Sequence, residues 1–325
     1  MIQKHISRLV YMLRLTVLKR YLANANNLNS PVRVISGSPR GGTTWLYEVI
    51  EKNSSGFGIW EPLHPKSVQD FYKDTNQWFH KFVPANEKNY ELEKYFTALL
   101  KGEFITESLL QKNSKFRTYK STSFLLQKYC RLSPLLPWFN HHFPNVKVVH
   151  MYRNPLAVVS SQMRHGAWNY KKEYNGYELT GLEYYPAYYK QFEEILSTIK
   201  FPEEVLAANW ALDMIPTLLN RNDDNILYIK YEDLFLSSEM YFPQVFEFFN
   251  LPIPKDLSEI ITKPSSTTKQ GSNIIDNPEK QLETWKKYLT EEQVERVRGI
   301  LSQFGFSQIG DIEYKLELNR KVEIF

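Results

Sequence analysis

Cysteine is nearly absent from this sequence of 325 residues, in which Cys130 is the only one. A single thiol can form neither an intrachain disulfide nor a zinc site built from several cysteines. We therefore expect a cytoplasmic protein in which Cys130 is a small buried apolar residue. We expect neither a membrane-spanning helix, which needs about 18 apolar residues, nor a secretory signal, because charges interrupt the apolar stretches near the start.

Acidic residues are lacking in the first 31 positions, where five basic residues stand. The whole chain has a net charge of +4, so the rest of the chain is close to neutral. It therefore lacks the large basic face that is typical of nucleic-acid-binding proteins, and we expect no nucleic-acid partner.

Residues 1–31 are predicted to form a basic amphipathic helix. Helical spacing puts five apolar residues on one stripe: Ile6, Val10, Leu13, Val17 and Tyr21. Three cations fall opposite them: Lys4, Arg8 and Lys19. Such a helix either docks on the domain or makes a peripheral contact with an anionic membrane through residues 1–22.

Short runs rich in β-branched residues alternate with segments of helical spacing. The runs are "VRVIS" (32–36), "FRTYKS" (116–121), "VKVVHMY" (146–152) and "NILYIKY" (225–231). The clearest helical segment, "TTWLYEVIEKN" (43–53), follows the first run. This alternation predicts an α/β fold, a three-layer P-loop-like domain over residues 32–305 with a central parallel sheet flanked by helices.

Two other parts of the chain differ from this alternation. Residues 65–115 are rich in aromatic and charged residues and have no clear strand, so we interpret them as a helical insertion or lid. Thr290 and Gln293 have the spacing of a capping box at the start of a helix that Gly305 ends. Residues 306–325 are the C-terminal tail.

The stretch "SGSPRGGTTW", from Ser36 to Trp45, looks like a phosphate-binding loop without its lysine. A strand, a glycine-rich turn and a helix aim backbone N–H groups at one place and so make an anion site. Thr43 stands where nucleoside-triphosphate enzymes carry the lysine that meets the phosphates. The cation here is Arg40, inside the loop. A phosphosulfate, which has less charge than a triphosphate, suits this loop without a metal.

A second motif, "VVHMYRNPLAVVSSQM", contains the end of the third β-rich run. Arg153 ends the strand, Asn154 can cap the next helix, and Pro155 suits its first position. Ligands collect at the carboxyl ends of parallel strands. Ser161 lies about two turns into that helix, so Arg153 and Ser161 are predicted to bind a second phosphate.

Together these motifs resemble the 5′-phosphosulfate and 3′-phosphate elements of the sulfotransferase superfamily, whose donor is 3′-phosphoadenosine 5′-phosphosulfate (PAPS). "SPRGGTTW" is similar to "PKSGTTW" of the cytosolic branch, and Arg40 to the arginine of carbohydrate branches. "YRNPLAVVSS" has the family's arginine and serine at the expected separation, and "YIKYEDL" (228–234) resembles a later strand. The resemblance covers residues 32 to about 304 and implies a PAPS-dependent enzyme that needs no metal.

The resemblance also implies roles around the 5′ end of the donor. The 5′-phosphosulfate would be held by Arg40, Gly41, Gly42, Thr43 and Thr44. Trp45 would stack against adenine and Tyr231 would contact the base. The alternative for both aromatic residues is a place in the core.

The 3′-phosphate would be bound by Arg153 and Ser161. The loop "TTKQG" loosely resembles the basic "RKG" loop of the cytosolic branch, so Lys269 and Gly271 would close over this phosphate. A glutamine stands where the second basic residue of that loop is expected.

The acceptor needs a base within hydrogen-bond reach. In cytosolic relatives a histidine after a strand-end lysine has this role, and "YKSTSF" puts Thr122 in its place. The segment "GIWEPLHP" (58–65) resembles carbohydrate and bacterial branches, in which a glutamate is the base. We predict Glu61 as the base, with His64 as the alternative. Lys120 would assist at the sulfate or pair with a carboxylate.

The predicted reaction is metal-independent in-line transfer of a sulfuryl group from PAPS to a hydroxyl or amine. The glutamate segment favours a small metabolite or a glycan as acceptor, hence carbohydrate sulfation. The many tyrosines of residues 165–190 would stack on such an acceptor or fill a helical core. A P-loop nucleotide kinase and a non-catalytic nucleotide-binding module are the alternatives.

Overall fold

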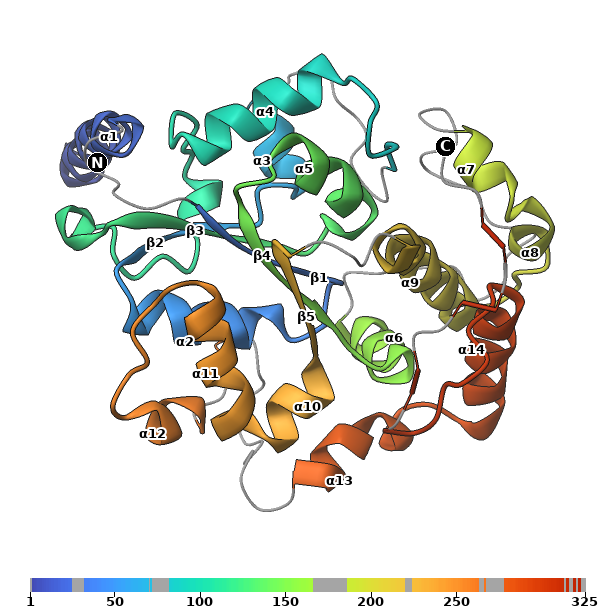
Figure 1. Ribbon diagram of the computed structural model, residues 1–325. Helices are drawn as coiled ribbons and strands as arrows, with labels where there is room; N and C mark the ends of the chain where they lie inside the picture. Colours follow the sequence, from blue (N-terminus) through green and yellow to red (C-terminus); the bar gives the residue numbers. More distant parts are fainter. Residues whose placement is uncertain are drawn as a thin grey trace.

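A parallel five-stranded sheet lies at the centre of the computed structural model, with the strand order β2-β3-β1-β4-β5 (Figure 1). The structure describes residues 2–24, 32–69, 71, 82–165, 186–219, 224–262, 266, 278–312, 314–315, 318–319 and 321–322. The strands are β1 (Arg33–Gly37), β2 (Gly56–Trp60), β3 (Phe124–Tyr129), β4 (Lys147–Tyr152) and β5 (Ile226–Lys230). The predicted parallel sheet is confirmed.

Helices cover both faces of the sheet and one of its ends. The α-helices are α1 (Ile2–Ala23), α2 (Thr43–Asn53), α3 (Pro65–Gln69), α4 (Tyr90–Leu100), α5 (Leu136–His142), α6 (Pro155–His165), α7 (Pro186–Lys190), α8 (Glu193–Ser197), α9 (Pro202–Leu219), α10 (Tyr231–Leu236), α11 (Ser238–Phe248), α12 (Leu257–Ile261), α13 (Pro278–Leu282) and α14 (Glu291–Gln303). The 3₁₀ helices are η1 (Ser108–Leu110), η2 (Tyr119–Ser121), η3 (Ser133–Leu135) and η4 (Glu283–Lys287).

The layers follow from the strands, whose successive side chains point to opposite faces. Val34 and Ile35, neighbours in β1, are both fully buried but belong to different apolar clusters. Figure 1 shows α2, α11 and α12 on one face and α4 and α5 on the other. The predicted three-layer α/β class is therefore confirmed.

A third apolar cluster joins α6, α9 and α14 beside the β4–β5 side of the sheet (Figure 1). The predicted capping box at the start of α14 is present: Gln293 N donates to Thr290 Oγ1 at 3.2 Å, and Thr290 N donates to Gln293 Oε1 at 3.0 Å. After α14 the chain returns to this cluster, where Ile309 and Tyr314 form a β-bridge and are buried. The C-terminal segment thus contributes to the core.

One predicted strand is wrong. Residues 116–121 form turns and the short helix η2, and β3 begins only after them. The aromatic residues of this run have another role, because two of their rings pack on α1. The ring centroids of Phe116 and Tyr11 lie 5.4 Å apart, and those of Tyr119 and Tyr21 lie 5.0 Å apart.

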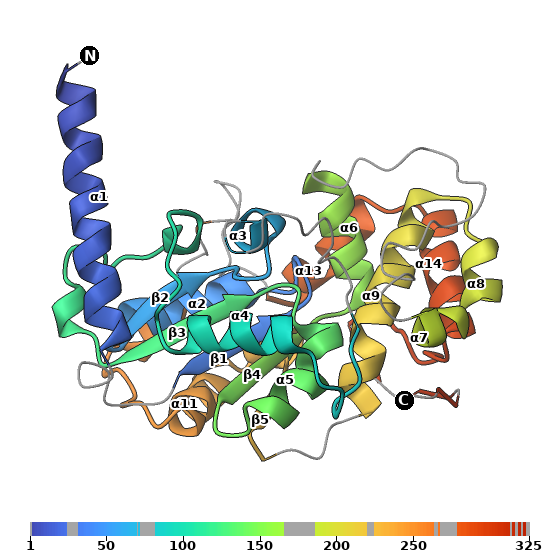
Figure 2. The same cartoon turned by 90° about the horizontal axis from the view of Figure 1, so that it is seen from above.

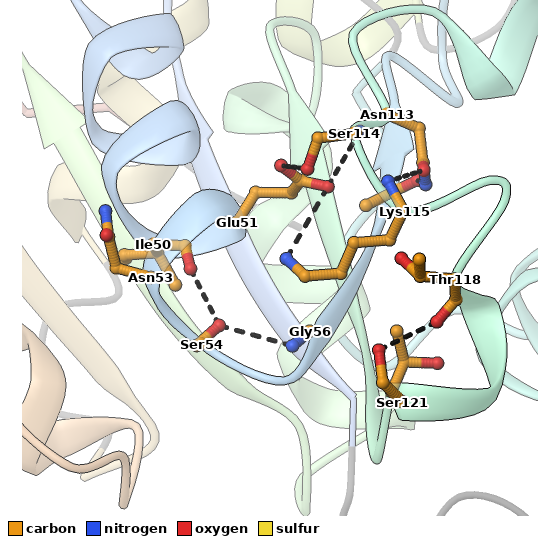
Figure 3. A network of polar contacts seen from close by, with 12 residues as sticks. Ile50, Glu51, Asn53, Ser54, Gly56, Asn113, Ser114, Lys115, Thr118 and Ser121 are labelled. Atoms are coloured by element: carbon orange, nitrogen blue, oxygen red, sulfur yellow. Dashed lines mark hydrogen bonds and ion pairs between the residues drawn. The ribbon is translucent and has the colours of Figure 1, made fainter.

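The turn before that segment is tied to α2 and to β2 (Figure 3). Ser114 donates to the buried Glu51 carboxylate through its backbone N–H at 3.0 Å and its hydroxyl at 2.7 Å. Lys115 Nζ lies 3.8 Å from the same carboxylate, and Asn113 Nδ2 donates to the Gly58 carbonyl at 2.6 Å. The strand β2 was not predicted, because its glycines make a weak strand signal.

The described part of residues 65–115 is helical, in α3, α4 and η1. Asn89 caps α4, where its side chain accepts from Leu92 N at 3.1 Å. The buried face of α4 consists of Leu92, Tyr95, Phe96 and Leu99. In the described ranges of the chain, no helix is long and apolar enough to cross a membrane.

Candidate functional site

The predicted phosphate-binding loop connects β1 to α2. Gly41 N donates to the Ser38 carbonyl at 2.9 Å and closes the turn. Gly42 is the N-cap of α2 and has a φ of 92°, in the left-handed region that favours glycine. Gly42 has no side chain with which to cap α2, so it leaves the first N–H groups of the helix available to an anion.

Glycines let other parts of the chain approach this loop. A Cβ on Gly37 would lie 2.3 Å from the Met151 carbonyl oxygen in β4, and a Cβ on Gly42 would lie 2.3 Å from the Tyr231 ring. Next in the loop, Thr43 is buried and Thr44 is half-buried. The end of β4 and the start of α10 therefore lie directly beside the loop.

The two motifs predicted to bind phosphates meet at this place. Arg40 Nε donates to Ser161 Oγ at 3.0 Å, and Arg153 Nη1 donates to the Arg40 carbonyl at 3.1 Å. The Arg153 guanidinium also lies over the Tyr231 ring, 4.2 Å from its centroid. Arg40 has a φ of 69°, a rare value for a residue other than glycine, which is typical of functional sites.

Positive charge is concentrated here, and the Glu232 carboxyl group interacts with it electrostatically through Arg153. Burial lowers the pKa of Arg40, and the like charges of Arg153 and Arg164 also lower it. Within the described ranges, neither Arg40 nor Arg153 forms an ion pair with a carboxylate. Half-buried cations that are grouped together favour an anion beside them, so the arrangement fits a bound phosphate.

Three buried polar atoms around the loop have no hydrogen-bond partner among the residues that the structure describes. They are Ser38 Oγ, Trp45 Nε1 and Arg153 Nε. An unsatisfied buried donor or acceptor costs about 1–3 kcal/mol. A ligand that carries acceptor oxygen and nitrogen atoms would offset this cost.

Trp45 belongs largely to the core. Its ring is 8% exposed and meets three aromatic rings edge-on: Tyr231 at 6.3 Å, Phe235 at 6.0 Å and Phe242 at 5.1 Å between centroids. The proposed stacking of adenine on Trp45 stays a prediction.

Distant segments support the turn that carries Arg153. Asn154 caps α6 as predicted, with Oδ1 accepting from Leu156 N at 2.9 Å. The buried Glu232 carboxylate accepts from Asn154 N at 3.0 Å and from the Tyr314 hydroxyl at 3.1 Å. The contribution of Glu232 and Tyr314 to this turn was not predicted, because no local pattern in the sequence connects them to the motif.

Glu61 lies just beyond β2, on the other side of the loop. It has a φ of 49°, and its carboxylate forms an ion pair with Lys128 and accepts from Cys130 N at 3.0 Å. Arg131 Nη1 lies 4.0 Å from Glu61 Oε2. Burial alone would raise the pKa of Glu61, but Lys128 and Arg131 outweigh it and lower this pKa. The carboxylate is therefore ionised at neutral pH.

Lys128, in β3, is a site residue that the sequence analysis missed. Its side chain is buried, with Nζ 4.2 Å from the centroid of the Trp60 ring and 2.9 Å from Cys130 Sγ. Cys130 Sγ lies 3.6 Å from Thr43 Oγ1. The Cys130 side chain therefore lies between Lys128 and the phosphate-binding loop. The apolar run "FLLQKY" could have indicated the strand that carries Lys128, but it was not predicted as a strand.

The strand-end position assigned to Lys120 and Thr122 was wrong. Lys120 is exposed on η2, and its carbonyl accepts from the Tyr21 hydroxyl at 3.2 Å. Thr122 donates its hydroxyl to the Tyr119 carbonyl. The structure does not bring Lys120 to the loop, because η2 precedes β3 and the loop follows the parallel strand β1, so the two lie at opposite ends of the strands. Just after the true strand lies Cys130, which is buried as expected.

His64 shares a turn with Glu61. Its backbone N–H donates to the Glu61 carbonyl at 2.9 Å, and its Nδ1 accepts from Lys66 N at 3.3 Å. Partial burial lowers the pKa of His64, and so do Arg131 and Lys66, while Glu61 opposes them. The exposed imidazole is neutral at pH 7 and able to accept a proton.

The predicted residues Lys269 and Gly271 lie outside the described residues. Ser266 precedes them, and its N–H donates to Glu48 Oε2 at 3.1 Å on α2. Among the residues with described positions, no group of three or more His, Cys, Asp or Glu side chains is arranged to hold a metal ion.

Comparisons with known proteins address the chain as a whole. A family model described as "Sulfotransferase domain" matches residues 31–304. A comparison with curated proteins finds no significant match.

Three solved structures resemble the chain. The sulfotransferase domain from the curacin biosynthetic pathway is 17% identical, with 85% of this chain and 98% of that chain covered and a TM-score of 0.44. Mouse sulfotransferase SULT7A1 complexed with PAP is 14% identical, with 88% of each chain covered and a TM-score of 0.43. Sulfotransferase STF1 from Mycobacterium tuberculosis H37Rv is 12% identical, with 88% of this chain and 81% of that chain covered and a TM-score of 0.41. Because these scores are low, the family assignment rests on the family model alone.

Proposed function

The chain belongs to the sulfotransferase domain family, and we propose that it moves the sulfuryl group of PAPS to a hydroxyl or amine of a carbohydrate or small metabolite. The proposal rests mainly on the paired arginines at the ends of β1 and β4. Arg40 and Arg153 touch each other through a backbone carbonyl and lack a carboxylate partner among the described residues. A donor with two separate phosphate groups would supply the missing negative charge at both.

The loop suits the 5′-phosphosulfate. Arg40 and the uncapped start of α2, from Gly42 to Thr44, provide a guanidinium, backbone N–H groups and two hydroxyls. Arg153 and Ser161 suit the 3′-phosphate, because an arginine can bind a phosphate through two hydrogen bonds. The orphaned Arg153 Nε and Ser38 Oγ provide further donors.

In the proposed reaction the acceptor oxygen or nitrogen forms a bond to sulfur while the bond from sulfur to the 5′-phosphate oxygen breaks. The acceptor proton passes to a side chain of the enzyme, and 3′-phosphoadenosine 5′-phosphate (PAP) leaves. Arg40 offsets the negative charge that grows on the leaving phosphate. The buried Lys128 ammonium, next to Cys130 and the loop, stabilises charge on the sulfuryl oxygens.

We propose Glu61 as the acceptor of the proton, with His64 as the alternative. The ion pair with Lys128 keeps Glu61 charged but makes it a weaker base, since both carboxylate oxygens already have protein partners. His64 is neutral at pH 7 and has fewer partners, but it is exposed. The resemblance to carbohydrate and bacterial branches supports Glu61 and a carbohydrate acceptor.

The test is an acceptor screen in buffer that contains EDTA. Full-length protein, PAPS and panels of sugars, amino sugars, phenols and alcohols are incubated, and PAP release is measured together with the mass of the products. We expect acceptor-dependent PAP release and a product heavier by one sulfuryl group. Tight binding of PAPS without any product would favour the non-catalytic module, and magnesium-dependent use of ATP would favour a kinase.

A cytoplasmic location and a peripheral membrane contact through residues 1–22 are also proposed. The single cysteine supports the first, and the basic composition of the N-terminal helix supports the second.

A further inference from the structure

The N-terminal helix α1 has two apolar faces, and only one of them is used by the fold. Leu15, Leu18 and Leu22 are buried against the domain. Tyr11 packs on Phe116 with ring centroids 5.4 Å apart. The helix α1 therefore docks on the domain mainly through a face other than the predicted stripe, of which Tyr21 alone among the described residues also packs on the domain.

Three residues of the predicted stripe remain in solvent, whereas Tyr21 at its end packs on Tyr119. Val10 is 42% exposed, Leu13 60% and Val17 53%. At about 100° per residue, their mean direction lies roughly 140° from that of the docked face. Exposed apolar residues of this size, gathered on one side of a helix, mark an interaction surface.

Positive charge surrounds this stripe. Arg14 and Arg20 are exposed and lie on either side of the stripe by helical register. The sequence of α1 contains no acidic residue. Burial raises the pKa of Tyr11, and so does the negative charge of Glu107, which therefore lies near the docked side of α1. The outer face is therefore apolar and bordered by cations, as in helices that lie on anionic membranes.

The shape of the molecule leaves room for a flat partner. Figure 2 shows α1 extending beyond the body of the protein, with its N-terminal half clear of the other elements. Its docked half contacts the segment that leads into β3, whereas the phosphate-binding loop lies at the carboxyl end of β1. A surface bound to α1 therefore leaves the loop free.

We infer that the Val10, Leu13 and Val17 face of α1 binds the surface of an anionic lipid bilayer and holds the domain beside it. A second copy of the chain fits less well, because two such basic faces would repel each other. The inference does not depend on the chemistry of the site. Each apolar side chain that enters the headgroup boundary should strengthen binding about tenfold.

The test uses full-length protein and flotation with vesicles of phosphatidylcholine alone or with one quarter phosphatidylserine. We expect binding to the anionic vesicles, weakened by salt. The double substitution Leu13→Gln and Val17→Gln should weaken this binding about a hundredfold. Arg14→Gln with Arg20→Gln should weaken it on anionic vesicles only.

Met240, an apolar residue on α11 that is 53% exposed, supplies the matched control. Met240→Gln should leave vesicle binding unchanged, and circular dichroism should show that every variant is folded. The inference would be overturned if the double variant Leu13→Gln with Val17→Gln bound anionic vesicles as strongly as the unchanged protein. It would also be overturned if the unchanged protein did not bind them. A dimer in light scattering that these substitutions dissociate would overturn it as well, since the occupant would then be a second copy. PAP release with a soluble acceptor measures the enzyme activity separately from vesicle binding.

Discussion

The two sides of the phosphate-binding loop differ in whether their cations are paired with a carboxylate of the protein. At the ends of β1 and β4, Arg40 and Arg153 lie together and lack a carboxylate partner among the described residues. At the ends of β2 and β3, Lys128 and Arg131 share the Glu61 carboxylate. The first side is built to receive anions from a ligand, whereas the second, called the balanced side below, already has a carboxylate of the protein between its cations.

This difference indicates what each side binds. Phosphate groups bring their own negative charge, so a site for them needs excess cations and donors. A hydroxyl or amine acceptor is neutral until it loses a proton, so its side of the site needs a base and no excess charge. The identity of the donor is therefore easier to infer than that of the acceptor.

The largest effect is expected from Glu61→Gln, which removes the proposed base from the balanced side. General-base catalysis contributes about 10²–10⁴-fold, so kcat should fall by that factor. PAP affinity should change little, because Glu61 does not contact Arg40 or Arg153. Steady-state kinetics and calorimetry measure the two quantities. An unchanged kcat would show that Glu61 is not the base, and His64→Gln would then be expected to abolish turnover.

Lys128→Met should lower stability as well as turnover, since Lys128 is also proposed to stabilise charge on the sulfuryl oxygens. The substitution leaves the Glu61 carboxylate partly buried without its partner, which costs about 3–5 kcal/mol in the free energy of unfolding. The double variant with Glu61→Gln should recover most of this loss, and urea unfolding measures both. The exposed Lys120, changed to Met, is the control and should have almost no effect. A double variant as unstable as Lys128→Met would contradict the pairing.

The pH dependence of kcat is a finer test of the balanced side. A base acts only when deprotonated, so kcat is retained above its pKa and lost as the pH falls through it. With Glu61 as the base, whose pKa is lowered, the loss should come below the ordinary value of 4.5. A loss below the ordinary histidine value of 6.5 but well above 4.5 would assign the role to His64, whose pKa is also lowered.

The unbalanced side was predictable from the sequence because each of its motifs is local. A glycine-rich turn between a strand and a helix fixes the loop, and Arg153 follows a clear strand within one motif. The structure brings the residues of the two motifs together, with Arg40 bonded to Ser161 and Arg153 bonded to the Arg40 carbonyl. What the sequence could not indicate was the support from Glu232, since that contact joins segments far apart in the chain.

The balanced side was only partly predictable. Glu61 was identified, but its partner Lys128 was not, because aromatic residues that pack on α1 made 116–121 look like a strand. A short run with aromatic residues does not by itself distinguish a strand from a turn whose rings pack on a neighbouring helix. The docked face of α1 was not predictable for a related reason. The apolar residues of this helix are arranged on two faces, and only the tertiary contacts show which face docks.

The most direct test of the account is thermal unfolding with PAP in EDTA, compared with ADP with and without magnesium. At about 100 times its dissociation constant, PAP should add roughly 2.7 kcal/mol to the stability of the protein. We predict this stabilisation without metal, and its loss in Arg153→Ala but not in Glu61→Gln. Stabilisation by ADP with magnesium and none by PAP would contradict the assignment of Arg40 and Arg153 to a phosphosulfate donor.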